Sequence, residues 1–170
     1  MDIEIRDSNI EEQLAETGKI VWKCRGVSMQ PLVHADSDIV VIESCNRDLK
    51  KYDVALYRSM RSRSGASNRE YVLHRVIDTE DDKYVILGDN CVTLEYVPKD
   101  DVVGRMVALI RDGEEKRLIG LPYTLYMILW IKPWRFRVAV IKARNKAHCF
   151  ASKTLPSPVK DKIKKVLHKA

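Results

Sequence analysis

The stretch "YVLHRVIDTEDDKYVILGDN", residues 71–90, places two runs rich in β-branched and aromatic residues on either side of a short polar segment. Such side chains favour β-strands, and the polar "DDK" segment between the runs favours a tight connection. We therefore predict strands at 71–80 and 83–89 that pair as a hairpin. This hairpin decides the fold class, because the segments around it repeat its pattern.

Similar runs occur at 38–44, 53–59 and 102–113, the last followed by a second tight connection, "DGEE". This density of short strands predicts a mainly β (α+β) protein with a folded-over β-sheet core. The polar, glycine-containing segment 61–68 is expected to be a surface loop.

Helices are expected at the two ends of the chain. A short one should run from Asn9 to Thr17, opened by the capping-box pair Ser8 and Glu11 and ended at Gly18. From Pro122 onward the pattern is helical, with interruptions at Pro133 and within 152–161. The predicted division is an N-terminal helix (1–20), a β core (21–120) and a basic C-terminal helical region (121–170).

Composition limits the class of protein. The chain has 170 residues, of which 45% are apolar and 32% charged, values typical of one soluble globular unit. The acidic N-terminus has no apolar run that would make a secretory signal or membrane anchor. We therefore expect a cytoplasmic protein with reduced thiols, because no CxxC pair or disulfide framework is present among the cysteines Cys24, Cys45, Cys91 and Cys149.

Two residues are candidates for chemistry. His74 lies in the middle of the strand predicted at 71–80, on the same face as Val72 and Val76, where a histidine is either a core residue or a base. Ser28, within "CRGVSMQPL" (24–32), is either a turn former or a nucleophile. A serine hydroxyl needs a neighbour to take its proton, and a neutral imidazole can do so. Their separation in sequence neither supports nor excludes contact.

Taken in order, six segments resemble the clan of serine peptidases that contains signal peptidases and the self-cleaving LexA-type repressors. The resemblance covers Val21 to Gly113. In the third family segment, Lys-x-Gly-Asp-Val, Tyr52 stands where the family has glycine. The six segments are "RGVSMQPLV" (25–33), "HADSDIVVIE" (34–43), "LKKYDVALYR" (49–58), "YVLHRVI" (71–77), "ILGDN" (86–90) and "VPKDDVVGRMVALI" (97–110).

The resemblance implies a Ser28 nucleophile and a His74 general base. Bacterial signal peptidases and LexA-like proteins use a lysine base, whereas the archaeal and endoplasmic-reticulum type uses histidine followed by arginine, as in His74-Arg75. It also implies that Asp89 orients the imidazole. Glu95 is a substitute for the family's downstream aspartates, and a Ser-His dyad with a structural Asp89 is the alternative.

The remaining site residues also follow from the resemblance. The oxyanion should be bound by backbone groups of the Gly26–Ser28 turn. Arg75 is expected to form a structural ion pair. No cofactor is expected, and no metal site either, because the resemblance makes His34, Asp36 and Asp38 a turn entering a strand. Structural support is expected from Met29, Pro31, Gly88 and Asn90.

Two departures from the family shape the functional prediction. The segment before Ser28 is polar, where signal peptidases carry a membrane helix and LexA-like proteins a DNA-binding domain. The Ala-Gly and Cys-Gly dipeptides at which LexA-like proteins cut themselves do not occur. We therefore expect a stand-alone serine peptidase that cleaves a peptide or protein substrate in trans. The alternatives are a catalytically silent peptide-binding or regulatory module and a DNA-linked regulator.

The C-terminal region suggests a second partner. From Lys132 onward the chain has 12 basic residues and one acidic residue, whereas residues 1–131 have 18 basic and 23 acidic residues. The apolar stretch 118–131 is too short to span a bilayer. Its helix either packs on the β core or lies on an anionic membrane, peripheral to the cytoplasmic face, as basic amphipathic segments such as 159–170 do. Nucleic acid is not expected, since no reading motif accompanies the charge. Interfacial aromatic rings would be Tyr123, Tyr126, Trp130 and Trp134.

Overall fold

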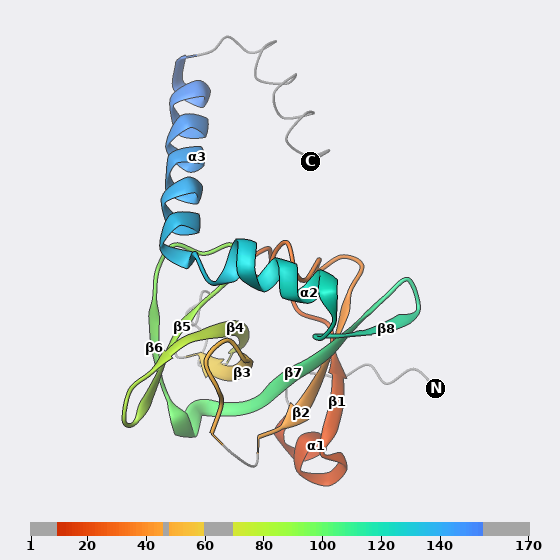
Figure 1. Ribbon diagram of the computed structural model, residues 1–170. Helices are drawn as coiled ribbons and strands as arrows, with labels where there is room; N and C mark the ends of the chain where they lie inside the picture. The colour runs from red at the N-terminus through yellow and green to blue at the C-terminus, as the bar shows by residue number, and fades with distance from the viewer. Residues whose placement is uncertain (1–9, 46–47, 60–69, 155–170) are drawn as a thin grey trace. The chain divides into compact units, whose positions relative to one another are not determined.

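The computed structural model describes residues 10–45, 48–59 and 70–154. The chain divides into two compact units, Met1–Lys132 and Pro133–Ala170. In the first unit the strands form one antiparallel sheet in the order β1-β2-β7-β3-β4-β5-β6, with β8 paired to β7 (Figure 1). The second unit contains the helix α3, Trp134–Thr154. The prediction of a mainly β protein is confirmed.

The five predicted strands are present within a few residues of their expected ends, and three further strands are short. Pro133 separates the helical segments as predicted. The elements are α1 (Ile10–Thr17), β1 (Lys19–Trp22), β2 (Ile39–Ser44), β3 (Val54–Ser59), β4 (Glu70–Thr79), β5 (Lys83–Leu87), β6 (Glu95–Pro98), η2 (Lys99–Asp101), β7 (Val102–Arg111), β8 (Glu114–Arg117), α2 (Leu121–Tyr126), the π-helical turn η3 (Met127–Ile131) and α3.

The division of the chain differs from the predicted one at both ends. Strand β1 begins at Lys19, inside the region predicted as N-terminal helix, and α2 and η3 belong to the same unit as the sheet. Ser8 of the predicted capping box lies outside the described residues, as do the loop 61–68 and the amphipathic segment 159–170. Glu11 accepts hydrogen bonds from Arg58 and Tyr71, at 2.6 and 2.7 Å. These bonds attach α1 to β3 and β4.

Two hydrophobic clusters stabilise the sheet unit. The first contains α1 residues such as Ile10 and Leu14 with side chains of β1, β2 and β7. The second gathers residues of β3 to β6, including Tyr57 and Val76. His74 pairs in register with Ala55, a member of this second cluster. His74 therefore lies on the face of β4 that carries this cluster, which it shares with Val76, as the alternation in strand 71–80 predicts.

Tyr52, at the entrance to β3, has a left-handed backbone with a φ of 77°. This conformation is costly for a residue with a Cβ and easy for glycine, the residue that the resemblance places here. It is maintained by the Tyr52 N–H, which donates to the Val76 carbonyl at 2.8 Å. The Tyr52 carbonyl accepts a hydrogen bond from Arg75 at 2.9 Å, so the turn positions an acceptor for a buried cation.

Candidate active site

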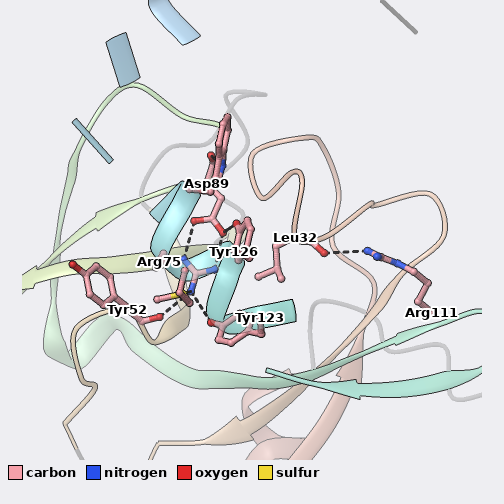
Figure 2. A network of polar contacts seen from close by, with 9 residues as sticks. Leu32, Tyr52, Arg75, Asp89, Arg111, Tyr123 and Tyr126 are labelled. Atoms are coloured by element: carbon pink, nitrogen blue, oxygen red, sulfur yellow. Dashed lines mark hydrogen bonds and ion pairs between the residues drawn. The ribbon is translucent and has the colours of Figure 1, made fainter. Parts of the chain in front are cut away.

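Ser28 lies half-buried in a turn that is fixed from both sides. Gly26, with a φ of 82°, allows the chain to reverse before it, and Met29 is buried behind it. On the far side, Arg111 of β7 donates to the Leu32 carbonyl at 3.0 Å (Figure 2). Through Nε, Arg111 also donates to Asp38 at 2.8 Å. The hydrogen bond from Arg111 is the main reason that the pKa of the buried Asp38 is lowered to about 2.

The Gly88-Asp89-Asn90 turn binds the Ser28 turn directly. The Asn90 backbone N–H donates to the Ser28 carbonyl at 2.8 Å, and the Asn90 side-chain amide donates to the Val27 carbonyl at 3.2 Å. These two bonds join segments that are about sixty residues apart in sequence. The backbone of the predicted nucleophile is therefore held by the predicted Gly-Asp-Asn turn.

Gly88 marks the point where the candidate residues meet. A Cβ added to Gly88 would lie 2.7 Å from Cys91 Sγ, 2.8 Å from the Ser28 carbonyl oxygen and 2.9 Å from His74 Nε2. Real Cβ atoms essentially never approach heavy atoms this closely, so only glycine fits. Ser28 and His74 are thus brought to the same small space, with the Cys91 thiol beside them.

The orientation of the His74 ring is set at Nδ1. Nδ1 lies 3.1 Å from the Tyr57 hydroxyl oxygen and 3.5 Å from Glu95 Oε1. Because the Tyr57 hydroxyl donates its only proton to Glu95 at 2.9 Å, its oxygen must accept from Nδ1. The neutral ring therefore carries its proton on Nδ1, and Nε2 is an acceptor.

His74 Nε2 is a buried polar nitrogen, which accepts a hydrogen bond when the ring is neutral and donates one when the ring is protonated. The residue is only 5% exposed, and within the described residues Nε2 makes no hydrogen bond of ordinary length and angle. Buried polar atoms without such a partner are rare and concentrate at functional sites. The groups that share its space are the Ser28 turn and the Cys91 thiol.

The protonation of His74 is set by opposing effects. Burial by itself lowers the pKa of the imidazole, but interactions with Cys91 and Glu95 outweigh it and raise the pKa to about 9. At neutral pH the ring is therefore mostly cationic. The neutral form, which can accept a proton at Nε2, becomes the major form only above about pH 9.

Arg75 and Asp89 form a fully buried ion pair behind this space (Figure 2). The guanidinium makes two hydrogen bonds to the carboxylate, at 2.8 and 2.7 Å, and burial of the charges is offset by these bonds. Additional bonds come from Tyr126 to the Asp89 carboxylate (2.6 Å), from Trp130 to the Asp89 carbonyl (3.2 Å) and from Arg75 to Tyr123 (3.1 Å) and the Tyr52 carbonyl (2.9 Å).

The helical segment α2–η3 supplies three of these bonds. The polar atoms of Tyr123, Tyr126 and Trp130 are directed at the ion pair, so these groups bond within the protein. The segment, together with Ile119 just before it, also has aliphatic side chains that are 47–72% exposed: Ile119, Leu121, Leu125, Ile128 and Leu129. Among the described residues, no helix combines the length and apolarity needed to cross a membrane.

The predicted site residues are therefore only partly brought together. The structure brings four of them together: Ser28, His74, Gly88 and Asn90. Arg75 forms the expected ion pair, but its partner Asp89 bonds to Tyr126 and not to His74. The groups at Nδ1 of His74 are Glu95 and Tyr57. The exposed His34 uses its backbone N–H to bond Asp38, which is paired with Arg111. Sequence reasoning missed Tyr57 and Cys91, because strand register and the reach of a turn are not visible in a pattern of residue types.

Comparisons with protein-family models, with curated proteins and with solved structures found no match for this chain.

Proposed function

We propose that the protein is a serine endopeptidase of the signal peptidase and LexA-like clan, which cleaves peptide bonds in trans with Ser28 and His74. The observation that carries the proposal is the meeting of the Ser28 backbone and His74 Nε2 at Gly88. Three of the six ordered motifs, the serine turn, the histidine strand and the Gly-Asp-Asn turn, supply the residues at this point. A buried acceptor beside a half-buried serine suits proton transfer from its hydroxyl.

The proposed reaction uses Nε2 twice. The neutral ring takes the Ser28 hydroxyl proton as the oxygen attacks the substrate carbonyl, and the oxyanion is bound by backbone N–H groups of the Gly26–Ser28 turn. The resulting imidazolium protonates the leaving amine, which leaves an acyl-enzyme that water hydrolyses. Glu95 and Tyr57 orient the ring through Nδ1, and Asp89 acts structurally by neutralising Arg75.

A serine-directed probe tests the nucleophile. A fluorophosphonate should add once to the folded protein, at Ser28, and Ser28→Ala should lose the adduct completely. Ser37→Ala removes an exposed serine from the neighbouring turn and should label like the wild type. An adduct of equal yield in Ser28→Ala refutes the assignment. No adduct in folded wild-type protein favours the silent peptide-binding module.

We also propose that the protein binds anionic membranes peripherally. The exposed aliphatic surface of α2–η3 supports this, since contiguous exposed apolar side chains mark interaction sites. In the second unit, α3 carries exposed basic side chains, including Arg135, Lys142 and Lys146, and no acid between Trp134 and Thr154. Basic residues near an acidic lipid surface contribute about 1 kcal/mol each.

Vesicle flotation tests the membrane proposal. Binding to anionic vesicles should exceed binding to neutral ones at least tenfold and should weaken at high salt. Leu125→Gln with Leu129→Gln, at exposed positions, should reduce binding without unfolding the protein. Thr124→Gln, an exposed polar position on the same helix, is the matched control. Absence of binding to both kinds of vesicle contradicts the proposal.

A further inference from the structure

Cys91 lies beside the proposed base but has no place in the proposed hydrolysis. Its Sγ and His74 Nε2 are 2.7 and 2.9 Å from one point, the position of a Cβ on Gly88. The thiol is half-buried, and its backbone N–H is fixed to the Gly88 carbonyl at 2.9 Å. The second observation is Nε2 itself, a buried acceptor without a regular hydrogen bond that is directed into this space.

We propose that Cys91 is a reactive thiol, activated by His74 toward soft electrophiles such as peroxides and alkylating agents, and that its modification closes the serine–histidine site. The thiolate is the reactive form of cysteine, and a histidine at its side promotes it by accepting the proton or by stabilising the sulfur anion. Glu95 and Tyr57 orient the ring for the thiol in the same way as for Ser28.

With hydrogen peroxide the step is a two-electron oxidation of sulfur. The thiolate attacks one peroxide oxygen, an S–O bond forms, the O–O bond breaks, and the departing hydroxide takes a proton to become water. The product is a sulfenic acid. Two equivalents of a small thiol reduce it to the original cysteine, with release of water and a disulfide of the small thiol.

Modification should block the site because the surrounding space is full. Gly88 leaves no room even for a methyl group between Sγ, Nε2 and the Ser28 carbonyl. A group added to Sγ on the side that faces Nε2 therefore displaces the histidine ring or the Ser28 turn. Either movement separates Ser28 from its proton acceptor.

The inference concerns the same histidine as the proposed function but does not require Ser28 to be a nucleophile. The test is native labelling of the full chain with iodoacetamide, with the rate at each cysteine read by peptide mass. The exposed Cys149 and the buried Cys24 serve as internal controls. His74→Asn should slow labelling of Cys91 at least tenfold and leave the rate at Cys149 unchanged, whereas Ser28→Ala should not slow it.

Rapid labelling of the buried Cys24 in His74→Asn would show that this variant is unfolded. In that case Glu95→Gln replaces it in the test, and Cys91 of Glu95→Gln should be labelled severalfold more slowly than in the wild type. An unchanged Cys91 rate in the folded variant, or no labelling of Cys91 in wild-type protein, overturns the inference.

In wild-type protein, iodoacetamide or peroxide should also suppress fluorophosphonate addition to Ser28, and a small thiol should restore it only after peroxide. Cys91→Ala should show no such suppression relative to its own untreated sample. Labelled Cys91 without any reaction at Ser28 would reject the peptidase proposal alone.

Discussion

His74→Asn should lower the rate of Ser28 phosphonylation and of peptide hydrolysis by a factor of about 10²–10⁴, the usual contribution of a positioned general base. Asparagine can keep a donor near Tyr57 and Glu95 but has no atom at the position of Nε2. The comparison must use protein of equal helix and sheet content by circular dichroism. A folded His74→Asn protein of wild-type activity would rule out the mechanism.

The pKa of His74 predicts how the reaction rate depends on pH. Since only the neutral ring accepts the serine proton, the wild-type rate should rise about tenfold per pH unit and level off near the His74 pKa of about 9. Cys91→Ala removes an interaction that raises this pKa, so its profile should level off at lower pH. A wild-type midpoint near the ordinary histidine value of 6.5 would contradict this account of the site.

Folding stability should show the opposite trend. The pKa of His74 is raised in the folded state, so protonation stabilises the fold fully below about pH 6.5, and this contribution disappears as the pH rises through about 9. The form of His74 that stabilises the protein is therefore not the form that would act as the base. Thermal unfolding followed from pH 6 to pH 10 measures this contribution, which should be absent in His74→Asn.

Asp89→Ala should destabilise the protein by about 3–5 kcal/mol, the cost of leaving a buried charge without its partner. Arg75 has no exposed surface and binds Asp89 through two hydrogen bonds. The change also removes the acceptor of the Tyr126 hydroxyl. Urea unfolding with a common slope measures the loss.

Glu95→Gln provides the matched control for Asp89→Ala. The Glu95 side chain is 25% exposed, so its neutralisation should cost little stability. Glu95 is one of the groups that raise the His74 pKa, so the two proteins are compared above about pH 9, where the ring is neutral in both. There Glu95→Gln should reduce the rate of Ser28 phosphonylation because the imidazole loses the carboxylate at Nδ1. Per folded molecule, Asp89→Asn should react within a few-fold of the wild type. If Asp89→Asn instead loses the reaction while Glu95→Gln keeps it, the two carboxylates have exchanged roles and Asp89 orients His74.

The sequence predicts the longer strands because they are runs rich in apolar, β-branched and aromatic residues. In β3 and β4 the buried residues are consecutive, so the apolar run rather than a strict alternation carries the signal. It does not predict β8, "EEKR", whose residues are all exposed and which is a strand only because it pairs with β7. Such a strand depends on its neighbour and not on its own side chains. The proposal that Ser28 and His74 act together rests on the order of the motifs and not on the strand pattern.

The partners of His74 required the fold. Tyr57 and Glu95 approach Nδ1 because β3 lies beside β4 and because the chain returns after the Gly-Asp-Asn turn. The distances from Tyr57 and Glu95 to Nδ1 cannot be derived from how far apart these residues lie in the sequence. The aromatic residues of α2 and η3 looked interfacial by composition, and only their hydrogen bonds show that they complete a buried network.

That network has a consequence for the order in which the chain is synthesised. Residues Arg75 and Asp89 emerge well before Tyr123, Tyr126 and Trp130, which bond to them in the folded protein. Until the later segment arrives, the ion pair lacks these partners and part of its cover. Because Asn90, next to Asp89, holds the Ser28 backbone, the Ser28 turn should be fully fixed only after the segment that contains Tyr123, Tyr126 and Trp130 has been synthesised.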